Sequence, residues 1–239
     1  MPGDDAAHRS RDLADRRWPQ LDGTHVVVLV PVGSLEQHGP HLPLATDTMI
    51  ADAVAHGAAD RLLAAGVPVV VAPAIGYGAS GEHEDFPGTI SIGHAALRLL
   101  VVECARSACR WATGVVFVNG HGGNVAALQD AVDQLRREGR QVIWHACVPP
   151  HGDAHAGRTE TSLVWHLAPG AVAGDRAEAG ARAPLPELML RLRRDGVRAV
   201  APNGVLGDPT DASSHEGELL LARLVDDLVA VVRDVHPWT

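Results

Sequence analysis

The chain has 239 residues, of which 46% are hydrophobic and 21% are charged. This balance excludes a disordered or fibrous protein and predicts a folded, soluble one with room for a sizeable core. All 20 basic residues are arginine, which excludes chemistry that needs a lysine, such as a Schiff base or a P-loop. The net charge of −9, without a basic block, argues against nucleic acid as a partner.

Cysteine usage and apolar runs point to a cytoplasmic location. The three cysteines form neither a C-x-x-C pair nor an even set, so we expect them to stay reduced. The first 20 residues lack an apolar run typical of a signal peptide, and the runs elsewhere are too short to cross a bilayer. No membrane partner is therefore expected. The 14 histidines, several of them near a carboxylate and a glycine, point to metal chemistry.

Predicted strands and helices alternate along the first part of the chain. Short β-branched runs predict strands, and apolar residues at helical spacing predict helices between them. The expected strands cover residues 25–32, 67–71, 115–118 and 141–146, and the expected helices cover 48–65, 94–111 and a segment that begins near 124. This order predicts right-handed βαβ units with helices on both faces of a mostly parallel sheet.

The rest of the chain is less regular. We expect a loop over 147–159, a short helix through Trp165, and then a segment rich in Ala, Gly and Pro. The last helix is expected to begin at 213–216, where Ser213 and Glu216 have the spacing of a capping box. Without an internal repeat or a linker, residues 26–239 are predicted to form a single domain, preceded by a variable, mobile segment over 1–25.

Reactive side chains follow all four predicted strands. In an open α/β sheet, ligands bind beyond the carboxyl ends of the strands, so these positions predict one common site. The clusters are Glu36, His38, His41 and Asp47; Ser80, Glu82, His83 and Glu84; 119–124 with His121; and His151, Asp153, His155 and Glu160.

The spacing within two clusters indicates particular roles. Glu36 and His38 are two residues apart, so an extended backbone turns both toward one metal ion. Asp47 precedes a predicted helix and is either its N-cap or a carboxylate that bridges two ions. His121 lies among glycines, which permit close backbone approach to a bound group.

Four motifs, in this order, resemble the creatininase (creatinine amidohydrolase) family. They are the stretch from Pro31 to Leu44 with Asp47, residues 86–89, residues 119–124, and His155-Ala156-Gly157 with Glu160-Thr161-Ser162. The resemblance runs from about 26 to 225. It implies a three-layer α/β/α sandwich, a two-metal site at the strand ends, hydrolysis of a C–N amide bond, and a ring-like homo-oligomer, a hexamer or octamer.

The resemblance also assigns metal ligands. Glu36, His38, Asp47 and His121 match the family's ligands, with Asp47 as the bridging carboxylate. Creatininase itself has a glutamate two residues after the motif histidine, where this chain has Gly123. We therefore expect Glu160 to supply that ligand, and the same change argues against creatinine as the substrate. Carboxylate and imidazole ligands without a thiolate suit Fe(II) or Zn(II), with Mn(II) as a further option.

Three further stretches, 77–83, 182–186 and 204–209, resemble a subgroup of the family. Members of this subgroup cleave a modified ribosomal precursor peptide and release its C-terminal pair, a valine cross-linked to a decarboxylated tyrosine. On this hypothesis His155 delivers a proton to the leaving amine, and Ser80, Glu82 and His83 line the substrate pocket.

Two other functions remain open from the sequence. One is an amidohydrolase that acts on a small cyclic amide or a formamide, which a smaller pocket would distinguish. The other is a non-catalytic, metal-binding scaffold that presents a modified peptide to a partner enzyme. The full set of five candidate ligands and His155 argues against a scaffold.

Overall fold

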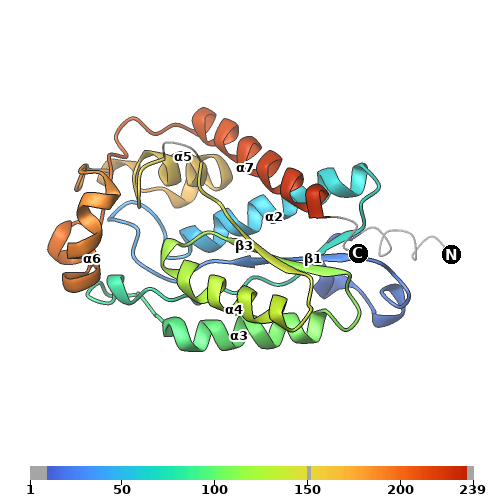
Figure 1. Cartoon of the computed structure of the whole chain (residues 1–239). Coiled ribbons are helices and arrows are strands. Elements are labelled where there is room, and N and C mark those ends of the chain that lie inside the picture. Colours follow the sequence, from blue (N-terminus) through green and yellow to red (C-terminus); the bar gives the residue numbers. More distant parts are fainter. Residues whose placement is uncertain (1–9, 150–151, 236–239) are drawn as a thin grey trace.

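A computed structural model of the chain describes residues 10–149 and 152–235, and its centre is a parallel sheet of four strands (Figure 1). The strands are β1 (Val27–Val32), β2 (Val69–Val71), β3 (Gly114–Asn119) and β4 (Val142–Ala146), in the order β2-β1-β3-β4. Every neighbouring pair is parallel. The predicted strands are confirmed, with ends that differ by one or two residues.

The central strands are buried on both faces, which explains why their sequences are almost continuously apolar. Along β1, Val27 and Leu29 pack on one face of the sheet, while Val28 and Val30 pack on the other. The same alternation continues in β3, because successive side chains of a strand point to opposite faces. Two separate cores therefore form, one on each side of the sheet.

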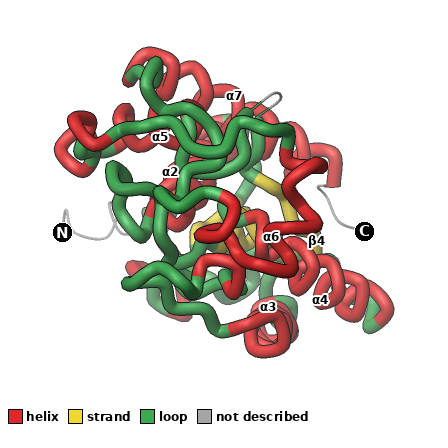
Figure 2. The backbone as a smooth tube through the Cα atoms, turned by 90° about the vertical axis from the view of Figure 1, so that its left-hand side faces the viewer, coloured by secondary structure: helices red, strands yellow, loops and turns green. Residues whose placement is uncertain are grey.

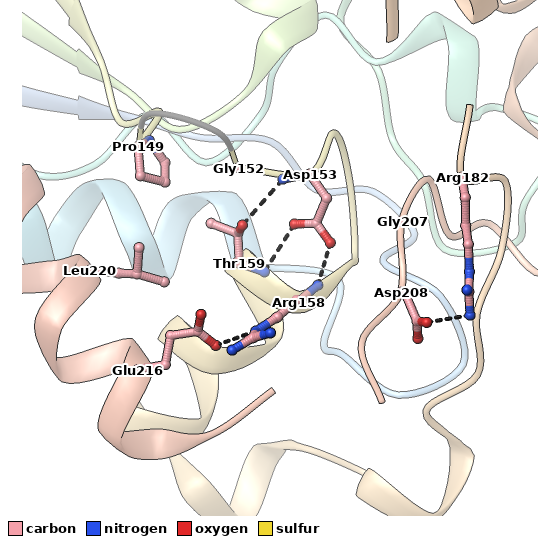
Figure 3. A pocket seen from close by; sticks show the side chains of 10 residues that line it. All are labelled: Pro149, Gly152, Asp153, Arg158, Thr159, Arg182, Gly207, Asp208, Glu216 and Leu220. Carbon is pink, nitrogen blue, oxygen red and sulfur yellow. Dashed lines mark hydrogen bonds and ion pairs between the residues drawn. The ribbon is translucent and has the colours of Figure 1, made fainter. Parts of the chain in front are cut away.

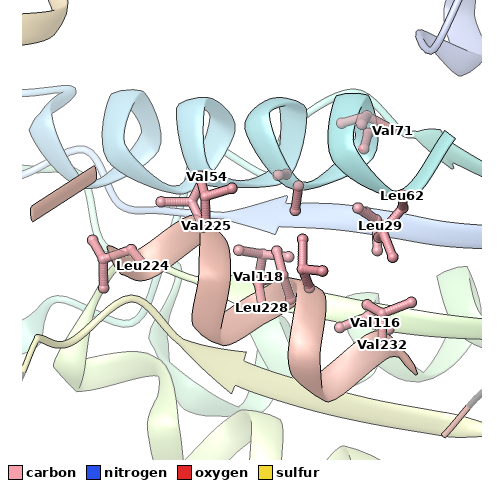
Figure 4. Packing of buried hydrophobic residues seen from close by; sticks show 14 of the residues in the cluster. Leu29, Val54, Leu62, Val71, Val116, Val118, Leu224, Val225, Leu228 and Val232 are labelled. Atoms are coloured by element: carbon pink, nitrogen blue, oxygen red, sulfur yellow. The ribbon is translucent and has the colours of Figure 1, made fainter. Parts of the chain in front are cut away.

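Helices cover both faces, so the molecule has three layers. The first core lies beneath α2 (Thr46–Ala64), α5 (Arg158–Leu167) and α7 (Ser214–Val235). Figure 4 shows part of this core, with Val54 and Leu62 from α2 and Leu224, Val225 and Leu228 from α7. The second core lies against α3 (Gly93–Ala108) and α4 (Val125–Arg137). The expected α/β/α sandwich is confirmed.

A helix that the sequence did not predict lies beyond the strand ends. Helix α6 (Leu185–Val200) begins with proline at its first turn and buries Leu188 and Leu192, one turn apart. Its backbone breaks at Gly196, where φ is +76°. Arg198 stacks over the ring of Phe86 at 5.3 Å and donates to the Asp85 carbonyl at 2.6 Å. Figure 2 looks onto this end of the molecule, where α6 lies among loops.

The described part of the N-terminal segment lies along the free edge of β2. Val71 N donates to the Arg11 carbonyl at 2.8 Å, and Asp12 forms a parallel bridge with Val71. The remaining residues of the expected mobile segment, 1–9, lie outside the described residues. Among the helices that the structure describes, none combines the length and the apolar character needed to cross a membrane.

Candidate metal centre

Loops at the carboxyl ends of β1 and β3 bring the candidate ligands together with the first turns of two helices. Glu36 and His38 follow β1, His121 follows β3, Asp47 lies in the first turn of α2, and Glu160 lies in the first turn of α5. Glu36, His38, Asp47 and His121 are all at least 95% buried. Residues up to 124 positions apart in sequence therefore converge on one buried site.

The atoms of these side chains form three overlapping groups that could each hold a metal ion. They are Glu36, Asp47 and His121; His38, Asp47 and Glu160; and Glu36, His38 and His155. Within each group the ligand atoms lie within 4.8 Å of one another. Asp47 belongs to the first two groups, so its two oxygens face different neighbours: Oδ1 is 3.0 Å from His38 Nε2, and Oδ2 is 3.3 Å from His121 Nδ1.

The carboxylates of this cluster fit bound cations. Both oxygens of Glu36, and Oδ2 of Asp47, are buried without a hydrogen bond. A buried carboxylate oxygen without a partner is costly, because it has lost its water and gained nothing in exchange. Two divalent ions that share Asp47 as a ligand would bind all three oxygens. Carboxylate oxygens are ligands that borderline metals accept.

The electrostatics of the cluster also favour added positive charge. Burial lowers the pKa of His38, but the Asp47 charge and its hydrogen bond outweigh burial and raise the pKa to about 10. For His121, burial is likewise outweighed, here chiefly by the charge of Glu36, and its pKa also rises to about 10. Without metal, both imidazoles therefore hold an extra proton at neutral pH.

The three carboxylates respond differently to the same environment. Burial and the neighbouring charge of Glu36 raise the pKa of Asp47. Burial raises the pKa of Glu160 to about 7, against the opposing charge of His38. Burial would raise the pKa of Glu36 too, but His121 and the other histidines around it hold it well below its usual value. Glu36 is therefore the most firmly ionised of the three.

Asp47 is not the N-cap of α2, the other role that its position allowed. The helix begins at Thr46, Ala45 precedes it as the cap, and the Asp47 carboxylate points to His38 and His121 instead. Thr46 Oγ1 donates to the Pro43 carbonyl at 2.7 Å and ties down the turn that leads into the helix.

His155 and His83 complete the site on the side of Glu36. The ring of His155 lies between the rings of His38 and His83, with centroids 4.3 and 4.4 Å away. His155 Nδ1 is 3.8 Å from Glu36 Oε1, and His83 Nε2 is 3.3 Å from the same oxygen. Burial lowers the pKa of both rings, that of His83 to about 4 and that of His155 well below its usual value. Both imidazoles are thus neutral at pH 7.

The expected substrate-binding residues lie in or just before the short helix η3 (Gly81–His83). Glu82 is partly exposed, and its Oε1 lies 3.6 Å from His121 Nε2. Burial raises the pKa of Glu82. Ser80 is fully buried and its hydroxyl is hydrogen-bonded to that of Ser34. Glu82 is therefore the one of the three that reaches both the cluster and solvent.

Gly123 explains how this chain accommodates Glu82. A Cβ at position 123 would lie 2.3 Å from His121 Nε2, 2.4 Å from the Ala79 carbonyl and 2.6 Å from Glu82 Oε1. No side chain fits there without displacing the candidate ligand His121. The space in which a glutamate at position 123 would begin is thus filled by the Glu82 carboxylate.

Two asparagines and a threonine hold the ligand loops in place. Asn119 Nδ2 donates to the His121 carbonyl at 2.7 Å, and Asn124 Nδ2 donates to the Gly33 carbonyl at 3.0 Å, which links the loops after β3 and β1. Thr89 Oγ1 accepts a hydrogen bond from Gln37 N at 3.1 Å. Gln37 was not selected from the sequence, although it lies between two candidate ligands and is itself 95% buried.

A separate cavity of about 560 Å³ opens beside the segment that carries His155 and Glu160 (Figure 3). Asp153 forms one wall and caps α5 by accepting from Thr159 N at 2.9 Å and from Arg158 N. Arg158 pairs with Glu216 at 2.7 Å, and Arg182 pairs with Asp208. The cavity is therefore lined by charged groups, and its wall is continuous in sequence with the candidate ligands His155 and Glu160.

Known proteins resemble this chain over nearly its whole length. The family model for creatininase, creatinine amidohydrolase, matches residues 14–232. A mycofactocin precursor peptide peptidase of Mycobacterium tuberculosis is 56% identical over 232 residues, which cover 95% of this chain and 91% of that protein. A creatinine amidohydrolase of Pseudomonas putida is 30% identical over 243 residues, which cover 89% of this chain and 91% of that protein.

Solved structures agree with the sequence comparisons. A mutant creatininase described as a Zn–Zn type superposes with a TM-score of 0.78 at 27% identity, covering 96% of this chain and 99% of that one. A structure described as creatininase Mn gives a TM-score of 0.77 at 27% identity, covering 96% of this chain and all of that one.

Proposed function

Because the chain belongs to the creatininase family, we propose that it is a metal-dependent peptidase of mycofactocin biosynthesis, a hydrolase of C–N bonds that acts on a modified ribosomal precursor peptide. One observation carries this proposal above the others. The chain combines 56% identity to a mycofactocin precursor peptide peptidase with a buried cluster in which three carboxylate oxygens make no hydrogen bond. The bond cleaved is the one that releases the C-terminal pair, a valine cross-linked to a decarboxylated tyrosine.

Five side chains are proposed as ligands of two divalent ions. Glu36, Asp47 and His121 would hold one ion, and His38, Asp47 and Glu160 would hold the other, so Asp47 would be shared by both. The overlap of these groups at Asp47 supports the assignment. When bound, two such ions polarise the scissile carbonyl and make a water molecule acidic enough to attack at neutral pH.

Proton transfer is assigned to His155. Its ring is buried, neutral and placed with Nδ1 toward the cluster, 3.8 Å from Glu36 Oε1. From this position Nδ1 accepts the proton of the attacking water and returns it to the leaving amine nitrogen. Because His155 also belongs to one possible ligand group, its role needs a direct test. His155→Ala should abolish cleavage and leave two ions per chain, whereas loss of an ion would make His155 a ligand.

The peptide is proposed to bind across η3 and the adjoining loops. Glu82 supports this because it reaches from solvent to His121, and His83 and Ser80 shape the same segment from its buried side. The cavity beside Asp153 has the size typical of sites for ligands larger than a small cyclic amide. It offers room for residues of the precursor peptide that precede the scissile bond.

The ions are proposed to be Fe(II) or Zn(II), with Mn(II) as the alternative. Mixed carboxylate and imidazole donors support all three metals. Zn and Mn are the metals named for the solved creatininases. We also propose a ring-like hexamer or octamer, supported by apolar side chains left exposed on α3, such as Leu99 and Leu100. A cytoplasmic location is supported by the three free cysteines.

A creatininase-like amidohydrolase that acts on a small cyclic amide or a formamide is the second candidate. The 30% identity to a creatinine amidohydrolase supports it. Gly123 argues against it, since creatininase resembles this chain elsewhere but carries a glutamate at that point of its motif. A non-catalytic scaffold for a modified peptide would use the same metal ligands. It would give no reason for His155 to lie beside them.

Mass spectrometry of the reaction mixture tests the proposed function. Metal-loaded protein is incubated with the cross-linked precursor peptide, and creatinine and a formamide serve as parallel substrates. We expect loss of the C-terminal Val–Tyr-derived fragment from the peptide, and no loss after the metal is removed by a chelator. Turnover of a small amide with an intact peptide would move the function to the second candidate, and binding without any turnover would favour the scaffold.

A further inference from the structure

The buried amide of Gln37 lies between two histidines that face Glu36, and both ends of the amide have polar neighbours. Gly39 N donates to Gln37 Oε1 at 2.9 Å. Because a backbone N–H can only donate, this contact fixes which end of the amide is the oxygen. The Nε2 end therefore carries two hydrogens and faces His83 Nδ1 at 2.8 Å, His155 Nε2 at 2.9 Å and the Gly204 carbonyl at 3.1 Å.

Two hydrogens cannot serve three acceptors, so one of the three contacts is of another kind. The backbone carbonyl of Gln37 lies 2.9 Å from His155 Nε2. A carbonyl oxygen only accepts, so this approach requires a hydrogen on His155 Nε2. The two amide hydrogens are then left for His83 Nδ1 and the Gly204 carbonyl. In this arrangement each of these contacts pairs a donor with an acceptor, except the one between Gln37 Nε2 and His155 Nε2.

We infer that Gln37 is a positioning residue that fixes His83 and His155 in the tautomers that carry their hydrogen on Nε2. His83 then presents its Nε2 hydrogen toward Glu36 Oε1, which lies 3.3 Å away. His155 keeps a bare Nδ1 toward the cluster, ready to accept a proton.

The packing around Gln37 leaves it little freedom to turn. A Cβ at Gly204 would lie 1.8 Å from Gln37 Oε1, and Gly204 has a φ of +81°, so only glycine lets the amide approach this closely. Thr89 Oγ1 fixes the backbone of Gln37 at the same time. The loop over 203–205 and the motif over 86–89 thereby help to hold Gln37, and through it the two histidines, in place.

The tautomers are measured by ¹⁵N NMR of the full chain, loaded with diamagnetic Zn(II) and labelled at the histidine rings. Protonated and bare ring nitrogens have well-separated shifts, and His83→Asn and His155→Asn variants assign the two rings. In the wild type we expect hydrogen on Nε2 of both. Hydrogen on Nδ1 of either ring would overturn the inference, and this reading needs no variant of Gln37 to fold.

The variant Gln37→Glu keeps the shape of the side chain and replaces the donating amide by an accepting oxygen. His83 should then move its hydrogen to Nδ1, while His155 keeps its own on Nε2. Gln37→Met, which offers neither donor nor acceptor, should leave His83 as a mixture of tautomers. Gln129→Glu makes the same change at an exposed amide on α4 and should alter neither ring. Unchanged tautomers in both Gln37 variants would refute the positioning role.

The kinetic consequence rests on the proposed function. Mutation of a residue that orients the groups around a metal site typically costs about 10- to 100-fold in activity or metal affinity. We expect kcat for precursor-peptide cleavage to fall by about that factor in Gln37→Glu, with KM unchanged within about twofold. If the wild type does not cleave the peptide but shows the expected tautomers, the proposed function fails and the inference about Gln37 stands.

Discussion

At the scale of single residues, the site depends as much on a missing side chain as on the ligands. Gly123 leaves room for Glu82 and for the ring of His121, and two of the atoms nearest to its imaginary Cβ cannot move cheaply, because one is a candidate ligand atom and one is a backbone carbonyl. The neighbouring Gly122 has nothing within 4 Å of its imaginary Cβ. Two adjacent glycines of one motif therefore carry very different constraints.

We predict that Gly123→Ala displaces the His121 ring and weakens metal binding. A Cβ contact of 2.3 Å cannot persist, so the imidazole must shift from its position. Metal affinity, measured by competition with a chromogenic chelator, should fall by at least about tenfold. Gly122→Ala is the matched control and should bind metal as the wild type does. Equal affinity in the two variants would show that His121 is not held by this contact.

Metal binding should release protons at neutral pH. His38 and His121 have a pKa of about 10 in the metal-free protein, so both are protonated at pH 7, and each must lose its proton to become a ligand. We expect about two protons released per chain from these imidazoles, and an affinity that rises with pH toward about 10. Calorimetry in buffers of different ionisation enthalpy measures the release. Binding without proton release would contradict this electrostatic account.

At the scale of elements, the N-terminal segment is held to α2 by a small ionic contact. His56 Nε2 lies 2.6 Å from Asp12 Oδ1, and His56 Nδ1 lies 2.8 Å from the Asp52 carbonyl. Burial lowers the pKa of His56, but these partners outweigh it and raise the pKa above its usual value. Arg11 pairs with Asp60 at 2.6 Å on the same helix. Together these contacts hold the segment that covers the edge of β2.

We predict that this contact stabilises the fold most at mildly acidic pH. A raised pKa in the folded state means that the stabilisation is fully present below about 6.5, the unfolded value, and is lost as pH rises through the higher folded value. After solvent screening, His56→Gln should lower the free energy of unfolding by about 0.5–1 kcal/mol at pH 6 and by less at pH 8. His215→Gln, at an exposed position, is the control for denaturant titrations. A difference that grows with pH would reject this reading.

The elements also show how far sequence reasoning reaches. The four strands were predictable because each is a short β-branched run buried on both faces, and Val27–Val32 is the clearest case. Helix α6 was missed because its arginines and the glycine at 196 mask a stripe of Leu188 and Leu192. Helix α6 packs against η3 and Phe86, which lie about a hundred residues earlier in the chain. No local pattern carries that information.

At the candidate site the same limit applies. Histidines and carboxylates after the strands were selected because parallel strands end at one edge of the sheet, and the structure brings Glu36, His38, Asp47, His121 and Glu160 together there. Gln37 was passed over, because the side chain between two ligands of an extended segment is expected to point away from them. Its role depends on Gly204 and His83, whose approach only the folded chain defines.

At the scale of the whole molecule, the sandwich places a buried polar cluster at the carboxyl ends of its strands, beyond the two apolar cores. The parallel strands bring the loops after β1 and β3 side by side, and α2, on one face of the sheet, supplies Asp47 from its first turn. The segment from the end of β1 to the first turn of α2 thus supplies Glu36, His38 and Asp47, and each proposed ion takes one further ligand from a later connection. Loss of Asp47 should affect both ions at once, which no other single ligand would do.

Metal content and cleavage of the Asp47→Asn variant test the central claim most directly. The amide keeps the size of the side chain but cannot bridge two cations as a carboxylate does. We predict two ions per chain and metal-dependent cleavage of the precursor peptide in the wild type. In folded Asp47→Asn, verified by circular dichroism, we predict fewer than two ions and a loss of cleavage of at least about 10²-fold. Two ions and full cleavage in this variant would contradict the account.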